Sequence, residues 1–186
     1  MAAPINGDHL TQGQPAGLSR HATPGGAVAG AVLRSARLSS GLSRKLLAAA
    51  ADVTEATLGS WEDGSEPLAF VPMPLIQRLE MALRGAGAEP RLVAELAVAA
   101  WCDLVILVIA AAEDPSCLLA DPLAADPAFC ELLTWSVTGQ PPARYRAYTA
   151  PGQLLPAANR ALIAKITVVI HAVSARTQPT IQVRER

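Results

Sequence analysis

Residues 41–64 contain two short helix-forming segments separated by a tight break, and this spacing limits the possible folds more than any other feature. The first segment is predicted over residues 43–51 and the second over residues 54–63, within the sequence GLSRKLLAAAADVTEATLGSWEDG. The break falls at residues 52–53, and Gly64 is placed to end the second helix. Two helices joined by so short a turn must pack against each other through small apolar faces.

Polar residues at the ends of both segments fit these helix boundaries. Ser43 stands where the first helix needs an N-cap, and Thr54 can cap the second. Asp52 occupies the turn, where a residue that tolerates left-handed backbone is wanted. The predicted buried face of the pair consists of Leu46, Leu47, Ala48, Val53, Leu58 and Trp61. This layout is that of a helix-turn-helix, in which the second helix enters the major groove of DNA.

The composition favours an all-α fold. Of the 186 residues, 51% are apolar but only 4% are aromatic, and alanine supplies much of the apolar share. An alanine-rich sequence with few β-branched runs packs more readily as helices than as sheets. Fifteen basic and sixteen acidic residues give a formal net charge of −1. Any attraction to nucleic acid must therefore come from a local basic patch.

The chain is predicted to have four parts. Residues 1–28 are rich in glycine and proline and form an arm that cannot bury enough surface to become ordered. We expect no signal peptide there, which favours a cytoplasmic location. Residues 29–84 form the helix-turn-helix domain, and a linker over residues 84–90 follows. Residues 91–176 form a helical dimerisation or regulatory domain, and residues 177–186 form a tail.

Apolar residues at helical spacing predict further helices over residues 29–40, 75–83, 91–112, 128–139 and 157–175. Asp-Pro pairs beginning at Asp114, Asp121 and Asp126 each fit an N-cap followed by proline at the first helical position. Short helices with sharp starts are therefore expected after these aspartates. A strand is the alternative for residues 166–173, which include several β-branched side chains, but no partner strand is visible in the sequence.

The apolar stretch over residues 92–112 raises the question of a membrane span. Glu95 and Asp103 interrupt it, and the uninterrupted run over residues 104–112 is too short to cross a bilayer. We therefore expect a buried helix and no membrane contact. Because the short run is apolar all round, it is either buried on every side or part of a subunit interface. The residues expected in a homodimer interface are Trp101, Leu104, Ile106, Leu107 and Val108.

Residues 37–64 resemble the XRE family of helix-turn-helix regulators, the Cro and phage-repressor type. The family's pattern is matched at Arg37, Gly41-Leu42-Ser43, Arg44, Leu47-Ala48, Val53-Thr54, Leu58, Trp61-Glu62 and Gly64. The resemblance covers about 55 residues of the chain, a typical size for such a module. It implies a cytosolic module of five helices, usually dimeric, that binds a roughly two-fold symmetric operator. The chain departs from the pattern at Asp52, where the family usually has glycine.

The resemblance also assigns positions that would face DNA. The base-facing positions are Thr54, Glu55, Ala56, Thr57, Gly59 and Ser60. None is Arg, Lys, Gln or Asn, the side chains that make paired hydrogen bonds with guanine or adenine. Glu55 can accept from cytosine N4, and Ala56 or the threonine methyls can touch a thymine methyl, but Glu55 equally suits a solvated helix face. The expected phosphate contacts are Arg34, Arg37, Arg44 and Lys45.

The leading hypothesis is a dimeric transcriptional regulator whose partner is double-stranded DNA. Residues 30–91 hold seven basic and seven acidic side chains, so this half of the chain has no strong basic field. Weak or shape-based reading of DNA is therefore as reasonable an expectation as tight sequence-specific binding. The alternative is a protein-interaction or assembly module that keeps the helix-turn-helix fold and works through a protein partner.

Other kinds of site have less support in the sequence. An effector pocket could be formed, beside Arg144 or Arg146, by the aromatic residues Trp101, Trp135, Tyr145 and Tyr148. Plain core is the commoner role for such residues. Neither metal-ligand spacing nor an activating basic neighbour accompanies the three cysteines, Cys102, Cys117 and Cys130. Carboxylate pairs, nucleophile–base sets and glycine-rich phosphate loops are also missing, so we expect no enzyme activity, cofactor or metal.

Overall fold

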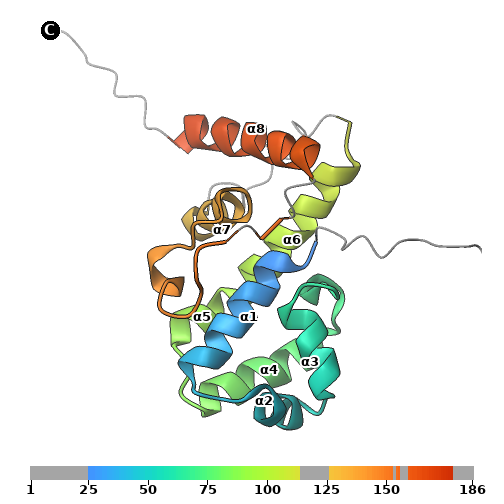
Figure 1. The fold of residues 1–186 in the computed structure, drawn as a ribbon, viewed down its shortest axis with the longest axis vertical. Helices are drawn as coiled ribbons and strands as arrows, with labels where there is room; N and C mark the ends of the chain where they lie inside the picture. Colours follow the sequence, from blue (N-terminus) through green and yellow to red (C-terminus); the bar gives the residue numbers. More distant parts are fainter. Residues whose placement is uncertain (1–24, 114–125, 153, 156–158, 178–186) are drawn as a thin grey trace, which may run out of the picture.

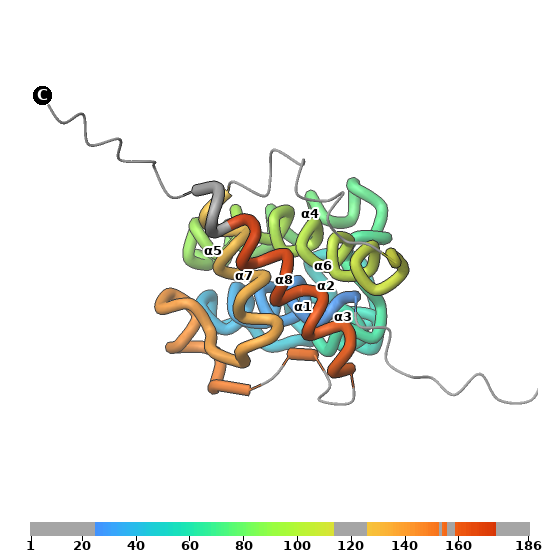
Figure 2. Tube along the Cα trace, turned by 90° about the horizontal axis from the view of Figure 1, so that it is seen from above, coloured from blue at the N-terminus to red at the C-terminus, as the bar shows by residue number. Residues whose placement is uncertain are grey.

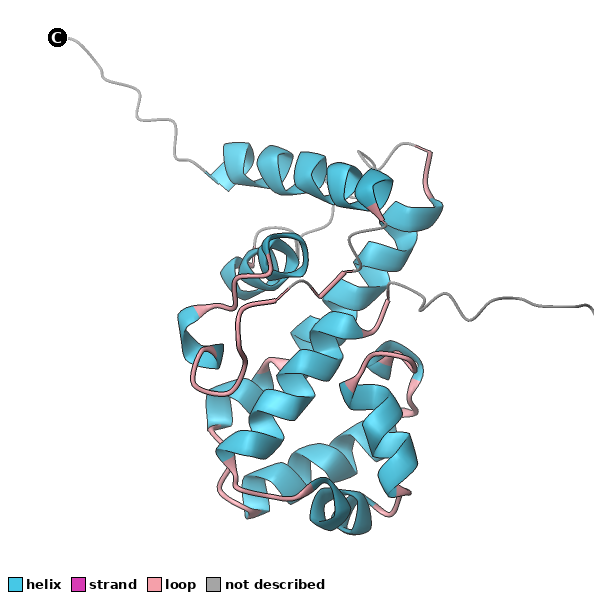
Figure 3. Cartoon of the chain, viewed as in Figure 1, coloured by secondary structure: helices cyan, strands magenta, loops and turns pink. Residues whose placement is uncertain are grey.

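The computed structural model describes residues 25–113, 126–152, 154–155 and 159–177. These residues form helices and connecting loops with no strand among them, as Figure 3 shows, which confirms the predicted all-α class. The α-helices are α1 (Ala27–Ser39), α2 (Arg44–Ala51), α3 (Glu55–Glu62), α4 (Met73–Gly85), α5 (Pro90–Ala94), α6 (Leu96–Ala111), α7 (Pro127–Thr138) and α8 (Arg160–Thr177). Two short 3-10 helices accompany them, η1 (Leu68–Phe70) and η4 (Ala143–Tyr145).

Helices α1 and α6 lie side by side through the middle of the molecule (Figure 1). Helices α2, α3 and α4 gather at one end of this pair, and α7 and α8 lie at the other. Figure 2 shows α8 crossing over α7 and α6, with which it is in contact. Helix α1 also touches α5 and α7, so one hydrophobic core runs through both halves of the chain. The segments over residues 29–84 and 91–176 therefore share a core and do not each enclose their own.

The N-terminus of α1 is held by a buried carboxylate from the other half of the chain. Asp103 of α6 accepts hydrogen bonds from the backbone amides of Val28 at 3.1 Å and Ala29 at 2.8 Å. A helix N-terminus leaves its first amides without partners and carries partial positive charge, so an acidic side chain satisfies both needs. This contact accounts for a helix that begins at Ala27, two residues before the predicted start.

Glycines allow α1 to approach the end of α3 closely. A Cβ atom on Gly30 would lie 2.5 Å from the carbonyl oxygen of Trp61, which is too close for any side chain. Gly64 ends the α3 region with a φ of 76°, a left-handed conformation that side chains rarely adopt. The predicted end of the second helix near Gly64 is thus confirmed, and glycine is required there for conformation as well as space.

Two features differ from the sequence prediction. The single helix expected over residues 91–112 is interrupted at Glu95, which separates α5 from α6 and turns its carboxylate toward the 140–150 loop. Leu46 was expected to be buried but is 59% exposed. Leu46 and Leu47 point about 100° apart around α2, and Leu47 is the one that faces the core.

The helices of the C-terminal half otherwise follow the prediction. The Asp126 side chain accepts from the amides of Ala128 and Phe129 with Pro127 at the first position of α7, as the Asp-Pro pattern predicts. Asp114 and Asp121 lie outside the described residues. Helix α8 covers the stretch for which a strand was the alternative, so the helical interpretation is confirmed. Among the described helices, none is long and apolar enough to cross a membrane.

The burial of Asp103 makes folding stability depend on pH. Burial raises the pKa of this carboxyl group from 3.8 to about 6, against the opposing effect of its amide hydrogen bonds. The folded protein therefore binds this proton more tightly than the unfolded chain does. The contribution of Asp103 to the free energy of unfolding is full below about pH 4 and is lost as the pH rises through 6.

We predict that the free energy of unfolding responds less to pH in Asp103→Asn than in the unchanged protein. Between pH 7.5 and pH 5.0, protonation of Asp103 should add about 1 kcal/mol, and the asparagine variant should lack this gain. Urea denaturation followed by circular dichroism at both pH values would measure it, with the exposed Asp63→Asn as control. Identical pH responses in the unchanged protein and Asp103→Asn would contradict this account.

Candidate nucleic-acid interface

Helix α2, the three residues after it and helix α3 form a compact unit, called here the α2–α3 unit (Arg44–Glu62). The Ser43 hydroxyl accepts from the amide of Leu46 at 3.2 Å, and the Thr54 hydroxyl accepts from the amide of Thr57 at 3.0 Å. Asp52 adopts left-handed backbone with a φ of 58° and a ψ of 47°. Both predicted N-caps and the predicted turn residue are therefore confirmed.

The inner face of the α2–α3 unit packs against its neighbours. Leu47 and Ala48 of α2 and Leu58 and Trp61 of α3 are buried, and Val53 between the helices is half-buried. Helix α2 packs on α4, while α3 packs on α1. These contacts leave the first turn of α3 on the outside of the molecule.

A carboxylate at the end of α3 joins three helices. The Glu62 side chain is only 1% exposed. Its carboxylate accepts hydrogen bonds from Arg37 of α1, from Nε at 2.5 Å and from Nη2 at 3.1 Å. Arg44 of α2 also donates two hydrogen bonds to Oε2 of Glu62, from Nε at 3.1 Å and from Nη2 at 3.0 Å. Arg37 also donates from Nη1 to the carbonyl of Leu42 at 3.0 Å. The network fixes α3 relative to both neighbouring helices.

The four basic residues predicted to contact phosphate are not equally available. Arg34 and Lys45 are exposed, and the Arg44 side chain is 40% exposed although two of its nitrogens bind Glu62. Arg37 has to be removed from the set, because its side chain is buried and its guanidinium is occupied by Glu62 and the Leu42 carbonyl. Nothing in the residues around Arg37 signals this, since its partner lies 25 positions away.

The predicted base-facing residues lie on the outer side of α3, but several of them form hydrogen bonds with one another. Thr54, Glu55 and Ala56 are exposed, and Thr57 and Ser60 are half-buried. The hydroxyls of Thr54 and Thr57 share a hydrogen bond of 2.8 Å, and the Ser60 hydroxyl donates to the carbonyl of Ala56 at 3.2 Å. Within the described residues, Glu55 is the member of this set whose charged group faces solvent without a hydrogen bond.

Further ion pairs reduce the positive field near the α2–α3 unit. Arg78 donates to the exposed Asp52 carboxylate at 3.1 Å, and Arg84 donates to Glu80 at 3.1 Å. The surface that remains carries the charges of Arg34, Lys45 and part of Arg44, with Glu55 among them. A ligand that meets this surface therefore encounters few positive charges.

The residues predicted for a dimer interface separate into two groups. Val108 is 46% exposed, and Trp101, Leu104 and Leu107 are half-buried. Ile106 is fully buried in the core and has to be removed from the set, since no part of it can reach another chain. Within residues 104–112, packing inside the chain buries Val105, Ile106 and Ile109, whereas Val108, Ala110 and Ala111 are exposed.

The aromatic residues considered for an effector pocket do not line a common cavity. Trp135 and Tyr145 are fully buried and stack with their ring centroids 5.1 Å apart. Glu95 accepts from Arg144 Nε at 2.7 Å and from the Tyr145 hydroxyl, and Arg144 also binds Glu131. The stacking and the ion pairs occupy most of these side chains, although Trp135 Nε1 and Arg144 Nη2 are buried without a hydrogen-bond partner among the described residues.

The cysteines and possible metal ligands carry no reactive site in the described part of the chain. Burial raises the pKa of the Cys102 thiol well above its ordinary value and also raises that of Cys130, so thiolate formation is disfavoured at both. Cys117 lies outside the described residues. Groups of three or more His, Cys, Asp or Glu side chains suited to a metal do not occur among the residues described.

In comparisons with protein-family models, curated proteins and solved structures, the chain matches none.

The Glu62 network predicts an unequal response to loss of its members. Glu62→Gln leaves the Arg37 charge buried without a counter-charge and should cost about 3 kcal/mol or more of unfolding free energy. Arg44→Ala removes a partly exposed partner and should cost about 1 kcal/mol or less, because water screens that pair. Urea denaturation of both variants measures the difference. Equal losses would mean that the network does not hold α3 in the way described.

Proposed function

We propose that this protein binds double-stranded DNA through a helix-turn-helix formed by α2 and α3 and regulates transcription from the bound site. The observation that carries the proposal is the α2–α3 unit itself. Its two helices of eight residues are joined by three residues, each helix has a hydroxyl N-cap, and the start of α3 is exposed. In a helix-turn-helix it is this first part of the second helix that contacts base edges.

Phosphate contacts would come from the N-terminal turn of α2 and its neighbours. Lys45 and Arg44 lie in that turn, where the unpaired amides and the helix dipole also favour an anion. The exposed Arg34 of α1 is a third candidate. Neutralising three phosphates per protomer predicts a slope of log affinity against log salt of about −3 per protomer. Such binding is modest and strongly weakened by salt.

Base reading by α3 would be limited because its exposed side chains are short. Glu55 can accept from the amino group of cytosine, and Ala56 can contact a thymine methyl group. The Thr54 and Thr57 hydroxyls already bind each other, which leaves them less suited to base contacts. We therefore expect sequence preference to come from few direct contacts together with the shape of the DNA.

A homodimer is part of the proposal, because a single α2–α3 unit reads only one half-site. Val108, exposed near the end of α6, would form the centre of contact between copies. Trp101, Leu104 and Leu107 are half-buried and could extend that contact. A solution mass equal to that of one chain across the concentrations used for DNA binding would exclude this part of the proposal.

A second candidate function is a protein-interaction module, and exposed apolar side chains favour it. Leu46, Phe70 and Met81 are 59%, 67% and 65% exposed and all belong to the same half as the α2–α3 unit. A contiguous patch of exposed apolar groups often marks a contact surface, and this second function requires that these side chains form part of one. Substituting Leu46→Lys separates the two functions, since the added charge should strengthen DNA binding but weaken binding to a protein partner.

The experiment that tests the main proposal is selection from a random DNA library by the purified full-length protein. We expect an enriched motif with two-fold symmetry and few strongly preferred positions. Fluorescence anisotropy at several salt concentrations would then give the slope. If no salt-sensitive binding occurs even at low ionic strength, the proposal fails and the protein-interaction function becomes the better one.

Lys45→Ala should weaken binding to all DNA sequences alike and reduce the magnitude of the salt slope by about 1. The reason is that an exposed lysine at the start of α2 contacts phosphate and not bases. Arg160→Ala is the matched control, because Arg160 is exposed at the start of α8, away from the α2–α3 unit. Anisotropy titrations on an enriched and a scrambled duplex measure both variants. A loss confined to the enriched duplex would show that Lys45 reads sequence.

Glu55→Gln should change which sequences are preferred as well as the overall affinity. Removing the negative charge reduces repulsion from phosphate, so binding to non-selected DNA should become tighter. If Glu55 also accepts from cytosine, preference at one base pair should fall, with about 1–3 kcal/mol of discrimination lost. Repeating the selection with this variant and with Glu66→Gln, an exposed acid outside α3, checks the expectation. An unchanged motif and affinity would place Glu55 on a face that does not meet DNA.

A further inference from the structure

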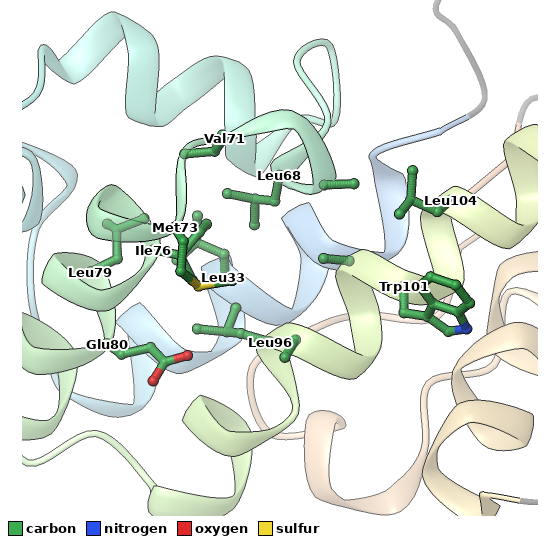
Figure 4. A pocket seen from close by; sticks show the side chains of 13 residues that line it. Leu33, Leu68, Val71, Met73, Ile76, Leu79, Glu80, Leu96, Trp101 and Leu104 are labelled. Carbon is green, nitrogen blue, oxygen red and sulfur yellow. The ribbon is translucent and has the colours of Figure 1, made fainter. Parts of the chain in front are cut away.

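A cavity of about 210 Å³ lies between α1, the segment from η1 to the start of α4, and α6. Its walls are almost entirely apolar, as Figure 4 shows, and include Leu33, Leu68, Val71, Ile76, Leu96 and Leu104. Met73 also lines the cavity although 64% of it is exposed, so the cavity opens to the surface beside a large apolar side chain. Apolar surface left in contact with water in a compact hollow is typical of a ligand site.

One charged side chain borders this cavity. Glu80 of α4 points toward the cavity beside Leu96 in Figure 4, and its side chain is only 24% exposed. Its Oε2 accepts from Arg84 at 3.1 Å, but the Arg84 side chain is mostly in solvent. A largely buried carboxylate whose single charged partner is mostly exposed to solvent gains from a further positive charge nearby.

We propose that this cavity binds a small amphiphilic amine, with a compact apolar body among the leucines and an ammonium group at Glu80. The size supports a small molecule, because a cavity of about 150 Å³ is sufficient to hold benzene. About 210 Å³ therefore accommodates an aromatic ring with a short alkyl chain. The charge of Glu80 sets the sign of the polar end, and the proposal does not depend on DNA binding.

The position of the cavity gives ligand binding a measurable effect on the fold. Its walls come from α1 and α4 in one half of the chain and from α6 in the other. A ligand that binds the folded state alone adds to the free energy of unfolding according to its concentration and affinity. An amine that fits should therefore raise the melting temperature in a saturable manner.

The test compares three molecules that share one apolar body and differ in their polar end: 3-phenylpropylamine, 3-phenylpropan-1-ol and 3-phenylpropanoate. Calorimetric titration of the full-length protein at pH 7 gives each affinity, and the melting temperature gives an independent reading. We expect the amine to bind about fivefold tighter than the alcohol, and the alcohol tighter than the carboxylate. Absence of saturable binding by the amine, or a carboxylate that binds as tightly, would overturn the proposal.

Two variants locate the binding. Glu80→Gln should remove the preference for the amine over the alcohol while leaving alcohol binding unchanged. Ala100→Leu should abolish binding of both, because Ala100 lines the cavity and a larger side chain would fill it. Glu66→Gln changes an exposed acid that is not among the residues lining the cavity; it is the control and should bind like the unchanged protein. Circular dichroism establishes that each variant is folded. Full amine preference in Glu80→Gln would refute the assignment of the charged end.

Discussion

The buried carboxylate of Glu62 determines how α3 is oriented relative to α1 and α2. An isolated helix of eight residues is unstable in water, so α3 depends on its neighbours for its direction as well as its existence. Leu58 and Trp61 anchor it through apolar contact, but such contact tolerates sliding. Ionic hydrogen bonds from Arg37 and Arg44 to one carboxylate are directional and allow a single arrangement. We expect the network to contribute to the specificity of the fold more than to its net stability.

This dependence limits what the same residues can do for a ligand. Residues 30–91 hold seven basic side chains, but Arg37 is bound to Glu62 and Arg78 is paired with Asp52. In the other half, Arg144 is likewise committed to Glu95. The number of arginines free to meet an approaching polyanion is therefore smaller than the number of arginines in the sequence. The same few arginines would have to serve both ion pairs within the chain and contacts with a ligand.

Local features of the chain could be predicted from the sequence, and long-range pairs could not. Ser43, Asp52 and Thr54 were identifiable because a cap or a turn depends on neighbours within three or four positions. The burial of Arg37 and the interruption at Glu95 escaped prediction, because their partners lie 25 and 49 positions away. The sequence alone shows that Asp103 places a charge, costly to bury, within an apolar helix. Its role as the cap of α1, 74 to 75 positions earlier, needed the structure.

The capping of α1 by Asp103 also bears on whether the N-terminal half of this protein can fold without the C-terminal half. A fragment that stops at the connection between α4 and α5 would leave the first amides of α1 without their acceptor. It would also uncover the face of α1 that packs on α6, including Val28 and Leu33. We therefore expect the N-terminal half not to fold on its own. Changes to the outer residues of α3 would therefore have to be made within the intact chain.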